Sequence, residues 1–247
     1  DSGMQPNHPD GGLIVDARNF TSSPTADDVY GHGTHVGGIV GARSNNGLGV
    51  TSVAFECPLL NAKCIADFGS GSFSWMAQAA IWAVQRGAKV INFSAAAPTG
   101  SQVMADAAKW VWDNGAIIVA AAGNQNSSVP RFPAAYPNVL AVASTQLNDT
   151  KSPYSNYGPW VSCGAPGANI WSTKKGSAYG YMAGTSQAAP HVSALAAMLF
   201  ARATAKGIPI TNQQVRDIIL RTCDALPVGT TGLGAGRINA YRAVSAV

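Results

Sequence analysis

The sequence predicts an α/β fold of three layers, in which a mostly parallel central sheet is covered by helices on both faces. Short apolar runs rich in β-branched residues alternate with segments of helical periodicity through most of the chain. The links between them are short, and strand–helix–strand units of this kind form right-handed crossovers onto a parallel sheet. The 247 residues contain no repeat, linker or change of composition. Residues 1–247 are therefore expected to form a single domain.

Four segments are predicted to be buried strands, because each is short and apolar and is bounded by Gly, Pro or Asn. They span residues 59–64, 89–93, 116–121 and 139–143. Two helices are expected between them, since apolar residues recur there at helical spacing and a glycine follows each run. The recurring residues are Trp75, Ala79, Trp82 and Ala83 in the first helix and Val103, Ala107, Trp110 and Val111 in the second, followed by Gly87 and Gly115 respectively.

An Ala-rich segment runs from Thr185 to about Thr204. Its residues are small on every face, so the segment is expected to be a helix that passes through the core. Pro190 is expected in the first turn of this helix, where a missing N–H costs little. Thr211 then offers a side-chain cap for a further helix that reaches Leu220.

Composition and charge exclude several classes of protein. The chain is 47% hydrophobic and only 11% charged, which is unlike a disordered segment. Its net charge of +4 is spread along the sequence, and Lys174-Lys175 is the only adjacent basic pair, so no nucleic-acid partner is expected. The longest apolar runs, at 116–122 and 195–201, are shorter than the ~20 residues that span a bilayer. We expect a soluble monomer without a membrane partner.

The cysteines leave several pairings open. Cys57, Cys64, Cys163 and Cys223 allow three full pairings and include no C-x-x-C pair typical of a redox or zinc site. If residues 59–64 form a strand, Cys57 and Cys64 lie roughly 20 Å apart, which is too far for a disulfide. A further interpretation is that all four are small buried hydrophobic residues.

Three polar clusters have the character of loops at the carboxyl edge of the sheet, where open parallel sheets bind ligands. They lie at residues 1–3, 31–36 and 184–191 and contain Asp1, His32 and Ser186. A hydroxyl becomes a nucleophile when an imidazole takes its proton and a carboxylate fixes the tautomer of that imidazole. Two other interpretations are weaker: Ser186 as a simple helix cap, and His32 with His35 as zinc ligands, since this H-x-x-H spacing lacks the HExxH pattern.

Two features on the same edge favour an anion that develops beside Ser186. This serine opens the Ala-rich helix, whose first N–H groups are unpaired and carry partial positive charge. Gly123-Asn124 follows the predicted strand at 116–121 and brings a carboxamide donor to the edge. The alternative for Asn124 is an ordinary turn residue.

Four motifs in this order and spacing resemble the subtilisin-like serine proteases of the subtilase family. They are Asp1-Ser2-Gly3 with His8-Pro9-Asp10, His32-Gly33-Thr34-His35-Val36, Ala121-Ala122-Gly123-Asn124, and Gly184-Thr185-Ser186 through Pro190-His191-Val192. The resemblance implies a subtilisin-like fold, a triad of Asp1, His32 and Ser186, and Asn124 as an oxyanion donor. It implies a secreted serine endopeptidase that cleaves polypeptides through an acyl-enzyme and matures from a precursor with an amino-terminal propeptide.

The resemblance also implies a substrate-binding edge. Ser94, Ala95 and Ala96 are similar to the segment with which the family pairs an extended peptide, and Gly123 is expected to bind substrate as well. The family usually has glycines where this chain has Ala96 and Ala97. Arg131 falls near a position where relatives often have a small residue at the base of the pocket for the residue before the scissile bond. We expect this pocket to be narrowed and lined by a cation, the alternative being a solvated loop arginine.

A structural calcium ion is a further expectation from the resemblance. Asp10 and the loop at residues 44–50 resemble the family's calcium site, with Ser44, Asn46, Leu48 and Val50 as ligands beside the Asp10 carboxylate. Oxygen ligands suit Ca²⁺. No catalytic cofactor is expected. The relatives use one more ligand near the mature amino terminus, which this chain lacks, and the alternative is an ordinary Asn-Gly turn.

The catalytic Asp of the relatives ends a strand, whereas here nothing precedes Asp1. We expect the recorded chain to lack its amino-terminal strand and its prodomain. This departure leaves a second hypothesis, an inactive module that binds peptides or an inhibitor through residues 94–96. An esterase or lipase is disfavoured, because those enzymes carry G-x-S-x-G and order the triad Ser, Asp, His.

Overall fold

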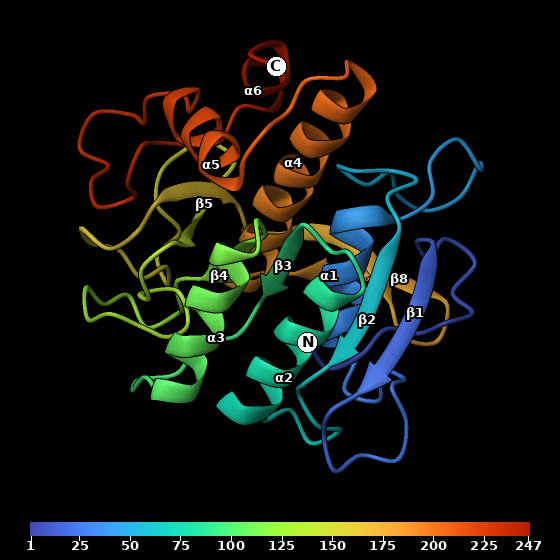
Figure 1. The fold of residues 1–247 in the computed structure, drawn as a ribbon. Helices are drawn as coiled ribbons and strands as arrows, with labels where there is room; N and C mark the ends of the chain where they lie inside the picture. Colours follow the sequence, from blue (N-terminus) through green and yellow to red (C-terminus); the bar gives the residue numbers. More distant parts are fainter.

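The computed structural model describes all 247 residues, with eight strands and six helices (Figure 1). The strands are β1 (Ile14–Asn19), β2 (Leu59–Lys63), β3 (Val90–Phe93), β4 (Ile117–Ala121), β5 (Val139–Thr145), β6 (Cys163–Pro166), β7 (Ile170–Lys174) and β8 (Ala178–Met182). The helices are α1 (His32–Gly41), α2 (Phe73–Gln85), α3 (Gln102–Asp113), α4 (Thr185–Ala205), α5 (Asn212–Arg221) and α6 (Ala240–Ser245).

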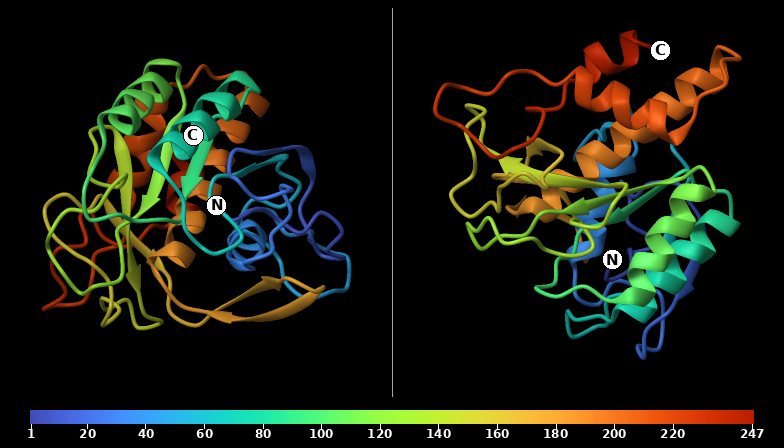
Figure 2. Two further views of the ribbon diagram at one scale, coloured as in Figure 1. Left: turned by 90° about the horizontal axis from the view of Figure 1, so that it is seen from below. Right: turned by 60° about the vertical axis from the view of Figure 1, so that its left-hand side comes forward.

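The core is a parallel sheet in the order β3-β4-β5-β6, with helices on both faces (Figure 2). Every residue of β4 and β5 is buried, as expected for strands covered on both sides. Alternate residues of β4 point to opposite faces: Ile118 and Ala120 pack in one cluster with α2 and α3, while Ile117 and Val119 pack in another with α4 and α5. The predicted α/β class is confirmed.

A second parallel pair, β1-β2, lies apart from this sheet. Between β2 and β3 is a mostly apolar cavity of about 420 Å³, lined by Leu60, Ala83 and Phe93 among others. Asp1 lies at the end of β2, where its carbonyl accepts hydrogen bonds from the N–H groups of Cys64 and Ile65, at 2.9 and 3.0 Å. The amino end of the chain is therefore held at the carboxyl edge of β2.

The four predicted strands all form, with limits shifted by one or two residues. The predicted strand at 59–64 ends at Lys63, and that at 139–143 continues to Thr145. Helix α1 was missed because its sequence contains four glycines and has low intrinsic helix propensity. It forms because eight of its ten residues are buried against the rest of the molecule.

Pro190 lies inside α4, at its sixth position, and not in the first turn as predicted. A proline there leaves the carbonyl of Ser186 without its usual helical donor. The hydroxyl of Ser94 donates to that carbonyl at 2.7 Å. The irregular position of Pro190 thus allows a hydrogen bond that joins the start of α4 to the end of β3.

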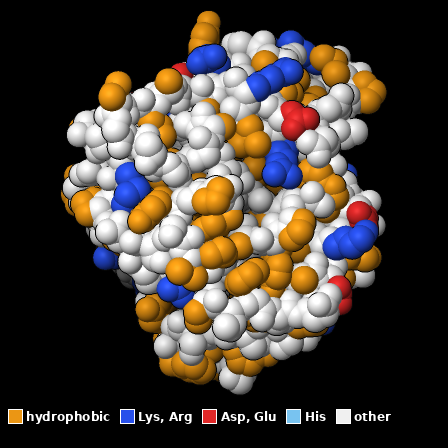
Figure 3. Space-filling model, turned by 90° about the vertical axis from the view of Figure 1, so that its left-hand side faces the viewer, with side chains coloured by type: hydrophobic (Ala, Val, Ile, Leu, Met, Phe, Trp, Pro, Cys, Tyr) orange, Lys and Arg blue, Asp and Glu red, His pale blue; other side chains and the backbone are white.

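The remaining helix predictions agree with the structure. Helix α4 reaches Ala205, and Thr211 caps α5 in a capping box with Gln214. No helix in the structure has both the length and the apolar character required to cross a membrane. The four cysteines are free thiols; Cys64 and Cys163 are buried as interpreted, whereas Cys57 and Cys223 are partly exposed. On the face drawn in Figure 3, basic side chains are scattered singly.

Candidate active site

An acid and an imidazole meet at the carboxyl edge of the sheet. His32 is the first residue of α1, and its Nδ1–H donates to Oδ1 of Asp1 at 2.8 Å. Both side chains are largely buried, with 18% and 15% of their surfaces exposed. The carboxylate therefore favours the tautomer that leaves Nε2 of His32 free to accept a proton.

The hydroxyl of Ser186 is bonded to Ser94, a residue that lines the same cavity as this pair. It donates to the carbonyl of Ser94 at 3.1 Å, and no hydrogen bond joins it to His32. Ser94 and His32 line one cavity of about 400 Å³ together with Asp1.

Thr185 orients the Asn124 carboxamide beside Ser186. The Asn124 Oδ1 atom accepts from the N–H and from the hydroxyl of Thr185, both at 2.9 Å. The Thr185 hydroxyl in turn accepts from the Gly123 N–H at 3.0 Å. These contacts occupy the oxygen and leave Nδ2 without a protein acceptor, only 3.3 Å from the point where a Cβ on Gly184 would lie. No pattern in the sequence pointed to this role of Thr185.

His32 is neutral at physiological pH. Its burial and, secondly, the positive charge of the Asp1 α-amino group lower the pKa of His32 to about 4, while the Asp28 carboxylate has the opposite effect. A neutral imidazole is the form that can accept a proton from a hydroxyl.

Asp28 is a buried carboxylate that caps α1, a role that no sequence motif indicated. Its two oxygens accept from the N–H groups of Gly31 and Thr34 and from the hydroxyl of Ser2, each at 2.7 Å. The N-cap residue of α1 is Gly31, which has no side chain to cap the helix, so Asp28 supplies the missing acceptors. Ser2 also accepts from the Gly33 N–H at 2.8 Å, which ties the residue after Asp1 to the residue after His32.

Gly33 allows the two segments to approach this closely. A Cβ at this position would lie 2.0 Å from the Gly3 carbonyl oxygen, a contact that no side chain can make. The Asp1-Ser2-Gly3 segment and the start of α1 are thus packed backbone against backbone.

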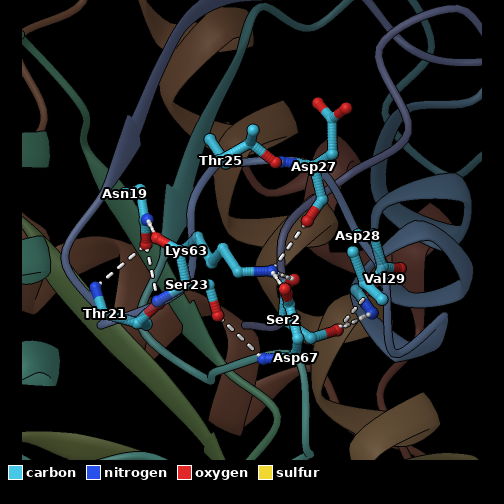
Figure 4. A network of polar contacts seen from close by, with 12 residues as sticks. Ser2, Asn19, Thr21, Ser23, Thr25, Asp27, Asp28, Val29, Lys63 and Asp67 are labelled. Carbon is cyan, nitrogen blue, oxygen red and sulfur yellow. Dashed lines mark hydrogen bonds and ion pairs between the residues drawn. The ribbon is translucent and has the colours of Figure 1, made fainter.

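Lys63 forms polar contacts that hold the Asp1-Ser2-Gly3 segment in place (Figure 4). Its side chain is fully buried, and Nζ donates to the carbonyls of Ser2 and Asp27 at 2.6 and 2.7 Å. Nζ also lies 2.7 Å from the carboxylate of Asp67, and the hydrogen bond from Lys63 holds the pKa of that carboxyl below its usual value. Three oxygens, from Ser2, Asp27 and Asp67, thus surround the Lys63 ammonium group next to Ser2.

Residues 94–97 form an edge beside this site. Ala97 pairs with Phe132 through two hydrogen bonds of 2.8 and 3.0 Å. The N–H and C=O groups of Ala95 and Ala96 have no backbone partner, and Ala96 is exposed. Such an edge can pair with an extended chain.

Arg131 lies next to this edge, because it immediately precedes Phe132, the bridge partner of Ala97. Its Cγ atom is 3.3 Å from the point where a Cβ on Gly123 would stand. The structure therefore places Arg131 beside Gly123 and Asn124, within a half-buried environment.

The predicted metal loop closes around Asp10. The fully buried Asp10 accepts from Nδ2 of Asn46 at 2.7 Å and from the N–H of Val50 at 2.9 Å. Oδ1 of Asn46 accepts from the Leu48 N–H, and the Ser44 hydroxyl bonds to that of Thr51. The structure thus brings Asp10, Asn46 and Val50 together, while the Ser44 hydroxyl turns to a different partner.

His35 is not placed as a second ligand beside His32. Its Nε2 faces the carbonyls of Ile170 and Gly180, both at 3.1 Å, and its side chain is fully buried. No group of three His, Cys, Asp or Glu side chains in the structure could hold a metal ion. His35 therefore serves to join α1 to the β7–β8 hairpin.

The α/β fold and an Asp–His pair at the carboxyl end of a strand are features that serine hydrolases share. The family model described as "Subtilase family" matches residues 1–239. Thermitase of Thermoactinomyces vulgaris is 38% identical over 246 residues, which cover 99% of this chain and 86% of Thermitase. The chain belongs to the subtilase family of serine endopeptidases.

Two further comparisons agree with this assignment. The thermophilic serine proteinase of Bacillus sp. (strain AK1) is 38% identical over 247 residues, and the alignment covers 99% of this chain and 60% of that relative. Among solved structures, a serine-to-alanine mutant of the protease domain of PatA has a TM-score of 0.90 and 29% sequence identity. That comparison covers 99% of this chain and 92% of the other.

We predict that Lys63→Met lowers the free energy of unfolding by about 2–4 kcal/mol, because it leaves the buried Ser2 carbonyl and the partly buried Asp27 carbonyl without a donor. The matched control is Lys109→Met, which removes an exposed ion pair with Asp113 and is expected to change little. Urea unfolding followed by tryptophan fluorescence measures both. Equal midpoints for the two variants would contradict the role given to Lys63.

Proposed function

We propose that this protein hydrolyses peptide bonds of extended polypeptides through a triad of Asp1, His32 and Ser186. The observation that carries the proposal is the 2.8 Å hydrogen bond between Asp1 and His32. It is supported by the bond from the Ser186 hydroxyl to Ser94, a residue that lines the same cavity as this pair. An acid, a base and a nucleophile at one edge are what acyl transfer requires.

In this mechanism Nε2 of His32 takes the proton of the Ser186 hydroxyl as Oγ attacks the scissile carbonyl carbon. Asp1 holds Nδ1–H and stabilises the imidazolium that forms. The negative charge on the substrate oxygen is stabilised by Nδ2 of Asn124 and by the Ser186 N–H at the start of α4. His32 then donates its proton to the leaving amine. Water attacks the acyl-enzyme in a second step with the same proton transfers.

We propose that the substrate lies along Ser94, Ala95 and Ala96 as an added strand. The free main-chain groups of Ala95 and Ala96 support this proposal, since they can pair with a peptide irrespective of its side chains. The residue before the scissile bond then enters the space between this edge and Gly123, with Arg131 at its base.

We infer further that the protein is a secreted, single-domain monomer formed from a precursor with an amino-terminal propeptide. The resemblance to the subtilase family supports this inference. The chain spans 60% of the length of the AK1 proteinase.

We also propose that the loop at residues 44–50 holds a structural calcium ion against Asp10. The donors are of the right kind, namely one carboxylate, one side-chain amide, and the carbonyls of Leu48 and Val50. The N–H groups of Asn46 and Val50 that donate to Asp10 occupy part of the space that a cation would fill. The Asn46 amide therefore has to rotate by half a turn so that its oxygen can bind the ion. The Ser44 hydroxyl likewise has to leave Thr51. With a single carboxylate, binding should be weak.

Reaction with a fluorophosphonate probe tests the proposed catalytic function. We expect rapid labelling of Ser186, loss of labelling in Ser186→Ala, and labelling slowed by at least 100-fold in His32→Ala. An exposed serine outside this cavity, such as Ser245 at the end of α6, serves as the internal control by peptide mapping. Absence of labelling at Ser186, in this chain and in one extended before Asp1, would favour the inactive binding module.

The pH dependence of the same labelling reaction follows from the state of His32. The rate should be low when His32 is protonated, rise through its pKa of about 4, and stay constant above it. In a chain extended before Asp1 the α-amino charge is absent, so the inflection should move to higher pH. An inflection at the same pH in both chains would contradict this electrostatic account.

Calcium binding is tested by thermal unfolding with calcium, with EDTA and with magnesium. Calcium at about 100 times its dissociation constant should raise the melting temperature by roughly 5 °C, because it binds only the folded state. Asn46→Ala should abolish this rise. An unchanged melting temperature in calcium and EDTA would contradict the proposed site.

A further inference from the structure

We propose that Arg131 makes this enzyme select an acidic residue, Asp or Glu, immediately before the scissile bond. The inference rests on the proposed function, since it assigns a substrate class to the same site. Three observations carry it: the position of Arg131, the absence of a hydrogen-bonding partner for its guanidinium, and the rigid loop at residues 122–127 beside it.

The position of Arg131 follows from two contacts. The bridge between Ala97 and Phe132 places residue 131 beside the substrate edge. On its other side, the Arg131 stem lies 3.3 Å from the point where a Cβ on Gly123 would be. Arg131 therefore lies between the segment that pairs with the peptide backbone and the loop that carries Asn124. A side chain next to the scissile carbonyl has to enter that same space.

The Arg131 guanidinium has no partner within the protein. The chain contains 12 Asp and Glu residues, yet the ion pairs formed by arginines involve Arg86, Arg237 and Arg242 and not Arg131. Its Nε atom is buried and makes no hydrogen bond. Buried polar groups are nearly always paired in folded proteins. A half-buried guanidinium without an acceptor beside a substrate edge therefore points to an acceptor on the substrate.

The loop at residues 122–127 forms a rigid wall beside Arg131 and contains no acidic residue. Asn156 fixes it by accepting from the N–H groups of Gln125 and Ser127 and donating to the Ala122 carbonyl. A Cβ at Gly123 would lie 2.5 Å from Asn156 Nδ2, so only glycine leaves this space open. The charged side chain that hydrogen-bonds to this loop is another cation, Lys151, which donates to Asn126 at 2.7 Å. Nothing in this wall can neutralise Arg131.

These features favour a carboxylate over other side chains. A guanidinium presents two parallel N–H groups that match the two oxygens of a carboxylate. The long Arg131 side chain also takes up volume that a large aromatic residue would need. An acidic substrate residue thus satisfies the buried nitrogen, whereas an aromatic residue leaves it unpaired.

The experiment compares peptides that differ only in the residue before the scissile bond, which is Glu, Gln or Phe. We expect kcat/KM for the Glu peptide to exceed that for the Gln and Phe peptides by about 10- to 100-fold, as for a hydrogen-bonded ion pair. Arg131→Met keeps the length of the side chain and removes its charge, so the preference for Glu over Gln should vanish. Arg202→Met, at an exposed position on α4, makes the same change of net charge and should leave the preference intact.

Binding of product peptides separates this inference from the proposed function, because it needs no turnover. Peptides that end in Glu or Gln are titrated against the wild type and Arg131→Met by calorimetry. Tighter binding of the Glu peptide to the wild type alone would support the inference, even if Ser186 fails to react with the fluorophosphonate. Equal binding of the two peptides, or a Glu preference that survives in Arg131→Met, would overturn it and leave the catalytic proposal standing.

Discussion

The hydrogen bond between Asp1 and His32 is the constraint on which the rest of the site depends. It joins residues from two segments that share no sheet, and it fixes which nitrogen of the imidazole can act as a base. A carboxylate at the first residue would fray without support. Here the backbone around it is held on several sides: by Cys64 and Ile65 on the Asp1 carbonyl, by Lys63 on the Ser2 carbonyl, and by Asp28 on the Ser2 hydroxyl.

The second half of the site is organised from the core helix α4. The hydroxyls of Ser94 and Ser186 form a reciprocal pair of hydrogen bonds, in which each hydroxyl donates to the main-chain carbonyl of the other residue. Pro190 makes one of these bonds available by removing a helical donor. Next to them, Thr185 turns the Asn124 amide so that its donor group faces outward. The start of α4 is thus placed relative to β3 and β4 by side-chain hydrogen bonds and not by apolar packing alone.

Much of the fold could be predicted because β4, β5, α2, α3 and α4 carry their pattern within a few residues. Six elements were not predicted: β1, β6, β7, β8, α1 and α6. Two of them show the lack of a local signal, since β1 is a half-exposed strand that carries Asp16 and Arg18, and α1 is rich in glycine. Pro190 was misplaced because its tolerance inside a helix depends on Ser94, which lies 92 residues from Ser186 in the sequence.

The same distinction applies to the site. Asp1, His32, Ser186 and Asn124 belong to recognisable motifs and could be named in advance. Asp28, Lys63 and Thr185 could not, because their roles consist of contacts with residues distant in the sequence. A lysine in a short strand is expected to be exposed to solvent, yet Lys63 is fully buried. The cation expected at the base of the pocket, Arg131, stays a prediction; its contact with Gly123 and its lack of a partner became visible only in the structure.

The central claim is that these groups act together on one reacting carbon, and a crystal structure of the protein after reaction with a peptidyl phosphonate tests it most directly. The account predicts phosphorus bonded to Oγ of Ser186, a phosphoryl oxygen about 2.7–3.1 Å from Nδ2 of Asn124, and Nε2 of His32 facing the adduct with its bond to Asp1 intact. A phosphoryl oxygen directed away from Asn124, or an imidazole separated from Asp1, would contradict it.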